Sequence, residues 1–432
     1  MCHVGHRSYA SFTPGLRPGQ RFGLDYLLWF SLLDPDDPIY NPDFLFSADT
    51  SKRDLNSYYL KMPSATPAAK TIQQYVASKK GGPFQMTTAP YPVPGPDEIC
   101  IRNRAVGLNP LDWKNLHLGM MVESWPCIFG IDTAGVVEVV GKNVTGIKAG
   151  DAVMSLAGHG GRAGAFQDVT TVPANFACRK PAAFTFEQAA SVPICYLTAV
   201  SAIIKGLGIP LPHLREPPKT NLPNLDDLTS PLTASKGPEL PVQPAEITSV
   251  LLLGGSSGVG GSAVQLLRQA LPDLVIITTN SPAHKEKVTK LGATAWVDRN
   301  LPSAQLVKAI KQASPYGKGV DAIIDAVAAA ADSNGAVFDA FKGDGPKLYS
   351  QVMTGTKVNV PDGVKAATVV GRMAFQVDGA GAAMTKLVDL VDAGKFKLPL
   401  EIEVVGKGLE SIGAGLEKLK AGVSGKKLVV SL

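Results

Sequence analysis

The chain has 432 residues, of which 45% are hydrophobic and 18% are charged, a balance that allows two globular domains with substantial cores. The formal net charge is only +5 and no run of lysine or arginine stands out, so a nucleic-acid partner is not indicated. The five cysteines are dispersed, which argues against a disulfide framework and fits a reducing compartment.

The first 61 residues differ from the rest of the chain. They are rich in aromatic side chains and show no sustained period, so they form either an ordered N-terminal arm or a stretch that belongs to no fold; the second is favoured. Their most apolar run, residues 24–33, is too short to span a membrane, contains Asp25 and is followed by no small-residue cleavage site. We therefore expect a cytoplasmic protein without a membrane segment.

Residues 97–180 have the composition of short β-strands separated by turns that contain glycine and proline. A second irregular tract, residues 209–245, is rich in proline, which removes backbone donors and disfavours helix interiors. Because structureless loops of this length are uncommon inside compact domains, we expect a surface insertion there. In the first region, strands are expected at residues 98–105, 135–140 and 166–172.

From residue 248 onward, apolar strands alternate with amphipathic helices. This alternation predicts an α/β fold with a parallel sheet covered by helices on both faces. Strands are expected at residues 249–253, 274–278, 295–297, 320–325 and 348–352, and helices at 262–270, 284–291 and 303–313.

A glycine-rich segment, residues 253–261 (LGGSSGVGG), joins the first of these strands to the first helix. In the G-x-G-x-x-G fingerprint of dinucleotide-binding proteins, Gly255 and Gly260 take the outer places and Ser257 replaces the middle glycine. Small residues let the backbone turn tightly and approach a pyrophosphate, which binds the free N–H groups of the helix N-terminus. An ordinary tight turn between strand and helix is the alternative.

The end of the second strand distinguishes between nicotinamide cofactors. Enzymes that use NAD place an acid there for the ribose hydroxyl, whereas residues 278–285 (TTNSPAHK) contain no carboxylate before Glu286. Hydroxyls, an amide and a cation would accept a 2′-phosphate, which a carboxylate would repel. The sequence therefore favours NADPH, with Lys285 either near that phosphate or a solvated helix residue.

Five segments follow one another in the order typical of a known superfamily: residues 105–114 (AVGLNPLDWK), 129–137 (FGIDTAGVV), 164–166 (GAF), 189–193 (AASVP) and 422–430 (GVSGKKLVV). They resemble the zinc-free members of the medium-chain dehydrogenase/reductase superfamily. The resemblance covers about residues 65–432 apart from the proline-rich tract, and is closest to fungal trans-acting enoyl reductases and related quinone oxidoreductase-like proteins.

The resemblance implies two domains. One is a GroES-like β-rich catalytic domain over residues 62–198 and 375–432, and the other is a doubly wound Rossmann domain over residues 199–374. One departure is Asp298, where related reductases often have tyrosine.

Zinc-binding members of the superfamily have Cys and Gly-His-Glu at places where this chain has Asn109 and Gly130-Ile131-Asp132. Neither Asn nor Ile ligates tetrahedral zinc, and Cys195 alone cannot hold the ion. The four closely spaced cysteines of the structural zinc lobe are also missing. We expect no zinc site, which disfavours a mechanism that polarises an alkoxide on a metal.

The resemblance also implies roles for individual residues. It places Thr198 beside the nicotinamide, and it leaves Lys114 and Tyr196 as candidates for protonating an enolate. Lys114 is otherwise a solvated helix residue and Tyr196 a packing residue, while Asp112 is expected to fix its loop. The remaining expected contacts are Pro110, Leu111, Asp112 and Trp113 over the cofactor, Ser256, Ser257, Gly258 and Val259 at the pyrophosphate, and Ser281, Pro282, Ala283 and His284 at the adenosine phosphate.

Three functions remain open at this point. The leading hypothesis is an NADPH-dependent enoyl reductase that acts on an α,β-unsaturated acyl thioester, with an acyl carrier and a polyketide synthase as the expected partners. The second is an NADPH-dependent reductase of quinones or enones, and the third is a non-catalytic NADPH-binding protein. Turnover separates the third from the others, and acceptor preference separates the first two; a monomer or a homodimer is expected.

Overall fold

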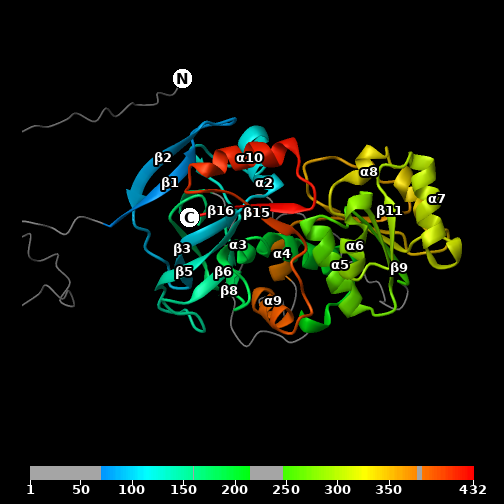
Figure 1. The fold of residues 1–432 in the computed structure, drawn as a ribbon, viewed down its shortest axis with the longest axis horizontal. Helices are drawn as coiled ribbons and strands as arrows, with labels where there is room; N and C mark the ends of the chain where they lie inside the picture. The colour runs from blue at the N-terminus through cyan, green and yellow to red at the C-terminus, as the bar shows by residue number, and fades with distance from the viewer. Residues whose placement is uncertain (1–69, 159, 215–246, 377–381) are drawn as a thin grey trace, which may run out of the picture. The chain divides into compact units, whose positions relative to one another are not determined.

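The computed structural model describes residues 70–158, 160–214, 247–376 and 382–432. The expected N-terminal arm, residues 1–61, lies outside the described residues, and so does the proline-rich tract after residue 214. Figure 1 shows the described part of the chain, with the helices α5, α6 and α7 grouped around one sheet and the strands β1 to β8 forming the other region.

A parallel sheet forms the first region, and it confirms the predicted α/β fold. In the described residues its order is β11-β10-β9-β12-β13-β14, with every neighbouring pair parallel. The edge strand β14 is mostly exposed and was not predicted, because its sequence (KAATV) lacks a buried apolar run. The strands are β9 (Ser249–Leu253), β10 (Val275–Asn280), β11 (Ala295–Asp298), β12 (Ala322–Asp325), β13 (Leu348–Val352) and β14 (Lys365–Val369).

Helices cover both faces of this sheet. Alternate residues of β9 enter different cores: Val250 and Leu252 pack in one cluster, and Leu251 and Leu253 pack in another. The first cluster contains the apolar residues of α5, and the second contains those of α7. A strand buried on both faces explains why β9 is an unbroken apolar run. These helices are α5 (Gly258–Ala270), α6 (Lys285–Lys290), α7 (Ser303–Ala313) and α8 (Ala329–Asp332).

The second region is built on largely antiparallel strands, as expected for the GroES-like domain. Its larger sheet has the order β15-β16-β3-β5-β6-β8, with β7 also paired to β3, so the C-terminal strand joins strands from the first half of the described residues. A smaller sheet has the order β2-β1-β4. The strands are β1 (Thr71–Ala77), β2 (Phe84–Pro90), β3 (Glu98–Gly107), β4 (Cys127–Ile128), β5 (Asp132–Val140), β6 (Ala152–Leu156), β7 (Val169–Pro173), β8 (Ala177–Arg179), β15 (Glu401–Lys407) and β16 (Lys426–Ser431); the helices are α2 (Pro110–Leu118), α3 (Phe186–Ala189), α9 (Ala383–Asp392) and α10 (Ser411–Ala421).

The helix α4 (Pro193–Ser201) lies between the two regions and packs against α5. It belongs to the helical stretch Phe186–Gly206, which alone among the described residues is long and apolar enough to cross a membrane, with a mean hydropathy of 1.4. However, 83% of its most apolar window is buried inside the protein. A core position therefore accounts for its composition, which the sequence analysis overlooked in favour of residues 24–33.

Of the expected insertion at residues 209–245, the structure describes residues 209–214. Ile209, Leu211 and Leu214 are buried in the same core as α4, and His213 lies beside Tyr196. The tract was assigned as loop because of its prolines, but apolar residues within residues 209–214 pack in the core.

Candidate functional site

A cavity of about 800 Å³ lies between the two regions, which is a typical size for a ligand site. Both regions contribute to its walls. Its charged lining residues are mostly basic: Lys114, Arg299, Arg372, Lys426 and Lys427 face it, whereas Asp332 is the one acidic lining residue in the described part of the chain. An anionic ligand is therefore favoured.

The predicted glycine-rich segment forms one wall of this cavity. Gly254, Ser256, Ser257, Gly258 and Val259 line it at the N-terminus of α5. The hydroxyl of Ser257 accepts a hydrogen bond from the N–H of Gly260 at 3.0 Å and so caps the helix. The remaining N–H groups of the first turn are available to an anion.

Close packing explains why glycine is needed in this segment. A Cβ added to Gly255 would lie 2.4 Å from Cβ of Thr278, and one added to Gly260 would lie 2.2 Å from the carbonyl oxygen of Gly254. Gly254 itself has φ +80°, a conformation that favours glycine. Gly255 and Gly260 therefore shape the segment, although neither lines the cavity.

The residues expected at the adenosine phosphate lie beside the cavity rather than in its wall. None of Ser281, Pro282, Ala283, His284 and Lys285 lines it. The imidazole Nε2 of His284 is 2.7 Å from the hydroxyl of Ser424, and so ties α6 to the C-terminal segment. The ammonium of Lys285 is exposed and lies 5.6 Å from the centre of the Trp296 ring, in keeping with a solvated helix residue.

Arg299 is a cation at this end of the cavity that the sequence analysis missed. It follows β11 directly, its N–H donates to the carbonyl of Asn280 at 3.1 Å, and its exposed side chain lines the cavity with Thr279. The carboxyl ends of neighbouring parallel strands meet at one edge, so the residue after the third strand could have been considered together with residues 278–285. Only its neighbour Asp298 was singled out in the sequence, and Arg299 was not.

The segment Asn109–Lys114 places the first turn of α2 at the cavity. Pro110, Leu111, Trp113 and Lys114 line it, whereas Asp112 points into the protein and is fully buried. The carboxylate of Asp112 accepts the N–H of Asn109 at 2.9 Å and the N–H of Gly130 at 3.2 Å. Asp112 therefore fixes its loop, and its assignment as a cofactor contact is wrong.

Burial raises the pKa of Asp112 to about 7, and Asp132 adds to this shift, while the two backbone hydrogen bonds and Lys427 oppose it. Desolvation disfavours the charged form more than the N–H donors favour it. The carboxyl group therefore titrates near neutral pH although no solvent reaches it.

Lys114 joins the two regions across the cavity. Its ammonium donates to the carbonyl of Thr354, in the parallel-sheet region, at 2.7 Å. Partial burial lowers its pKa. Lys114 is thus neither simply solvated nor remote from a ligand, and it remains a candidate proton donor.

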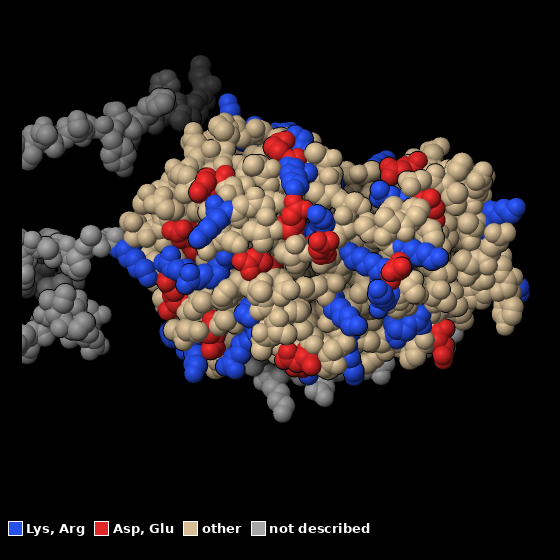
Figure 2. All heavy atoms as spheres, viewed as in Figure 1, with Lys and Arg blue, Asp and Glu red and all other residues tan. Residues whose placement is uncertain are grey.

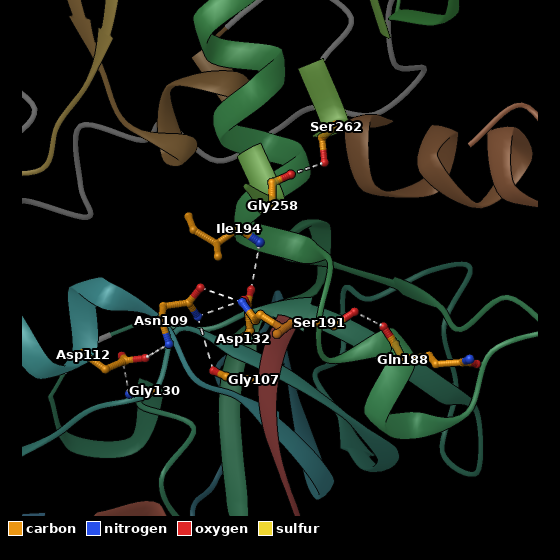
Figure 3. A network of polar contacts seen from close by, with 11 residues as sticks. Gly107, Asn109, Asp112, Gly130, Asp132, Gln188, Ser191, Ile194, Gly258 and Ser262 are labelled. Carbon is orange, nitrogen blue, oxygen red and sulfur yellow. Dashed lines mark hydrogen bonds and ion pairs between the residues drawn. The ribbon is translucent and has the colours of Figure 1, made fainter. Parts of the chain in front are cut away.

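A buried polar centre lies where zinc-binding relatives have ligands. The ammonium of Lys427 donates to Oδ1 of Asn109 at 2.6 Å and to Oδ2 of Asp132 at 2.9 Å. Asn109 Nδ2 donates to the same Asp132 oxygen at 2.9 Å, and the N–H of Ile194 donates to the other at 2.7 Å (Figure 3). Every oxygen of the Asp132 carboxylate thus has a donor.

Burial lowers the pKa of Lys427, but the charge of Asp132 and the other acidic groups together raise this pKa by more than burial lowers it, so the net shift is upward. The side chain is a charged ammonium that also faces the cavity. No role was predicted for Lys427; the signal was a lysine inside the otherwise buried strand β16.

The two remaining predicted residues are separated by the structure. Thr198 lines the cavity from α4. Tyr196 is fully buried and does not line it; its ring packs on Phe396 and its hydroxyl lies 3.0 Å from Nε2 of His213. Burial also raises the pKa of Tyr196 far above its ordinary value. Tyr196 as a proton donor to a ligand is therefore wrong, and it is a packing residue.

Within residues 70–158, 160–214, 247–376 and 382–432, no group of three or more His, Cys, Asp or Glu side chains could hold a metal ion. Asn109 and Ile131, the residues compared above with zinc ligands, are both buried, and the ammonium of Lys427 donates to Asn109. Cys195 lines the cavity nearby, and burial raises the pKa of its thiol, which keeps it protonated.

Comparison with known proteins supports this arrangement. Residues 95–182 match the family model of the alcohol dehydrogenase GroES-like domain. The dehydrogenase orsE of Emericella nidulans is 33% identical over 375 residues, which cover 84% of this chain and 99% of orsE. The trans-enoyl reductase tndF of Aspergillus flavipes is 32% identical over 56% of this chain and 65% of tndF. A chloroplast envelope quinone oxidoreductase homolog of Arabidopsis thaliana is 28% identical over 59% of this chain and 64% of that protein.

Solved structures share the fold at lower sequence identity. An alcohol dehydrogenase superfamily protein from Novosphingobium aromaticivorans has a TM-score of 0.63 and 23% identity, over 84% of this chain and 99% of that one. The mycobacterial protein Rv1454c, solved in complex with NADPH, has a TM-score of 0.60 and 21% identity, over 84% of this chain and 100% of that one.

Proposed function

Because the chain belongs to the medium-chain dehydrogenase/reductase superfamily of oxidoreductases, we propose that it binds NADPH in the cavity and reduces a conjugated acceptor there. The observation that carries this proposal is the cavity itself. The glycine-rich N-terminus of a helix, the cation Arg299 and the residues around Thr198 all line this one cavity. These are the three surroundings that the pyrophosphate, the 2′-phosphate and the nicotinamide require.

The residues of the cavity fit a dinucleotide. The first turn of α5 offers free N–H groups to a pyrophosphate, and the glycines around it leave room for close approach. Lys427 lines the same cavity, where its ammonium is paired with Asp132. The structure of Rv1454c, a protein of this fold, was solved in complex with NADPH, which supports NADPH as the ligand.

A preference for NADPH over NADH follows from the charges at the ribose edge. Arg299 and Thr279 line the cavity there, whereas the nearest acids, Glu286 and Asp298, do not. One carboxylate oxygen of Asp298 accepts the N–H of Asn300 at 3.0 Å, which holds this acid in its own turn. A guanidinium at this edge favours a phosphate over a hydroxyl.

The proposed reaction needs no zinc ion. The ammonium of Lys427 already neutralises the carboxylate of Asp132, and its charge repels a second cation from this position. Without metal to polarise an alcohol, the acceptor must be activated by conjugation, as in an enone, a quinone or an enoyl thioester. When bound, the nicotinamide supplies a hydride to such an acceptor.

The chain's own residues would position the acceptor and supply a proton. Trp113 and several methionines form an apolar wall that excludes water and adapts to an extended chain. Lys114 holds a proton inside the cavity, and its lowered pKa eases transfer to an enolate. We favour an α,β-unsaturated acyl thioester as acceptor, presented by a carrier of a polyketide synthase; the similarity to the trans-enoyl reductase tndF supports this choice. The methionines are Met120, Met121, Met353 and Met373.

The test is oxidation of NADPH and NADH, followed at 340 nm, with an enoyl thioester, an enone and a quinone. We expect faster turnover with the thioester, and an NADPH preference that Arg299→Met reduces by about 10- to 100-fold, the worth of one charge-assisted hydrogen bond. Lys285→Met is the matched control and should leave the preference unchanged. Faster turnover with the quinone would select the second hypothesis, and nucleotide binding without turnover the third.

A further inference from the structure

Arg372 is a basic residue of the cavity without a counter-charge in the part of the chain that the structure describes. It belongs to the 3₁₀-helix Gly371–Gln376, which packs against α4, and its side chain lines the cavity. Its guanidinium has no hydrogen bond or ion pair with any described residue. A partly buried charge without a partner costs free energy, so an anion entering the cavity would be stabilised beside it.

The backbone that carries Arg372 lies next to Thr198. A Cβ added to Gly371 would lie 2.8 Å from Oγ1 of Thr198 and 2.6 Å from Cδ1 of Ile194. The carbonyl of Gly371 also accepts the hydroxyl of Ser201 at 3.2 Å. This contact holds the start of the 3₁₀-helix against α4, at the end of the cavity assigned to the nicotinamide and the acceptor.

Burial lowers the pKa of Arg372, as expected for a charge that has no partner. In the proposed function, the neighbouring end of the cavity around Thr198 takes the nicotinamide and the acceptor. The nicotinamide carries no anionic group of its own, so an anion bound there by Arg372 would belong to the acceptor.

We propose that Arg372 binds an oxyanion, a carboxylate or a phosphate, carried by the acceptor, and so selects acidic acceptors over neutral ones. A guanidinium presents a planar fork of donors that matches the two oxygens of such a group. Met373 beside it and Trp113 in the facing region provide apolar contacts for the rest of the molecule. The inference rests on the proposed function, because it requires the acceptor to enter this cavity.

Two matched ligand pairs test it. One is a 4-oxo-2-alkenoic acid and its methyl ester, and the other is crotonyl-CoA and crotonyl-N-acetylcysteamine. Binding is measured by tryptophan fluorescence with NADP⁺ present, which donates no hydride, and turnover is measured separately with NADPH. The variants of the full chain are Arg372→Met and Arg372→Lys, with Arg104→Met as control, since Arg104 is exposed and does not line the cavity.

Arg372→Met should weaken binding of the charged member of one pair by about 10- to 100-fold while the neutral member changes less than about twofold. Arg372→Lys should retain part of the affinity, and Arg104→Met all of it. A loss confined to the acid identifies a carboxylate, and a loss confined to the CoA ester identifies a phosphate. Equal losses for both members of both pairs, or wild-type protein that does not distinguish them, would overturn the proposal. Selective binding of the charged member without turnover would leave it standing and refute the proposed function instead.

Discussion

Two parts of the cavity wall differ in how they accommodate a charged group. At the N-terminus of α5, backbone N–H groups and missing side chains prepare a place for an anion. At another part of the wall, three buried side chains, those of Asn109, Asp132 and Lys427, satisfy one another. The first is encoded in consecutive residues, whereas Asn109 and Lys427 are 318 residues apart. A backbone site depends on the absence of atoms, and a side-chain site depends on every partner being present.

The largest effect should come from breaking the side-chain site. Lys427→Met leaves the carboxylate of Asp132 buried with an uncompensated charge, which should reduce the free energy of unfolding by about 3–5 kcal/mol. Thermal and urea unfolding of the protein without nucleotide would measure it. Lys426→Met is the matched control, since this neighbour forms an exposed ion pair with Glu403 and should matter little. Equal stability of the two variants would refute the view that this centre depends on its charge balance.

The backbone site should be broken by adding one carbon atom. In Gly260→Ala the new Cβ meets the carbonyl of Gly254, so the turn must shift at a cost of about 1–3 kcal/mol. We expect NADPH binding, followed by fluorescence titration, to weaken by roughly tenfold or more. Gly343→Ala is the control, because nothing lies within 4 Å of its added Cβ. Unchanged affinity in Gly260→Ala would show that the pyrophosphate binds elsewhere.

A titration outside both sites sharpens the comparison. Burial, and then Lys386, lowers the pKa of His213 to about 4, so the folded protein keeps this imidazole neutral while the unfolded chain protonates it near pH 6.5. Its contribution to stability is complete above pH 6.5 and is lost as pH falls toward 4, amounting to about 2 kcal/mol by pH 5. His213→Gln keeps an acceptor for the hydroxyl of Tyr196 and should reduce the change in melting temperature between pH 7 and pH 5. An unchanged pH dependence would assign the acid sensitivity to other groups.

The smallest effect concerns the cap of α5. Ser257→Ala removes the hydroxyl that accepts the N–H of Gly260, which should cost about 1 kcal/mol of stability without nucleotide. Ser256→Ala removes a neighbouring hydroxyl that makes no such cap. A difference in melting temperature between the two variants isolates the cap, and identical melting would show that solvent satisfies the helix end equally well.

Sequence reasoning predicted the parts of this protein that depend on local patterns. The strand β9, the helix α7 and the strand β13 begin and end where the sequence indicated, because apolar period and turn residues are local properties. The glycine-rich segment was recognised for the same reason. Pro110, Leu111, Trp113, Lys114 and Thr198 line the cavity, and the roles expected of them there stay predictions.

The errors concern side-chain direction and distant neighbours. Asp112 and Tyr196 lie one or two positions from residues that line the cavity, but their side chains point into the core. One position along a helix turns a side chain by more than a quarter of the circumference, so a motif cannot say which residue faces the ligand. Arg372 was missed because only the folded chain brings its segment to the cavity, whereas Arg299 and Lys427 had local signals, at the end of a strand and inside a buried strand.

The excess of basic residues around the cavity has a consequence for the rate of binding. A concave, low-dielectric wall that carries one sign of charge attracts anions before contact and speeds their diffusional encounter with the protein. Nucleotide association should therefore slow as ionic strength rises, while dissociation changes much less. The same attraction extends to any polyanion small enough to enter, so phosphate-rich metabolites would compete for the cavity even where their shape fits poorly. In this way the electrostatic field, which acts before any specific contact forms, would couple the enzyme's activity to the ionic composition of its surroundings.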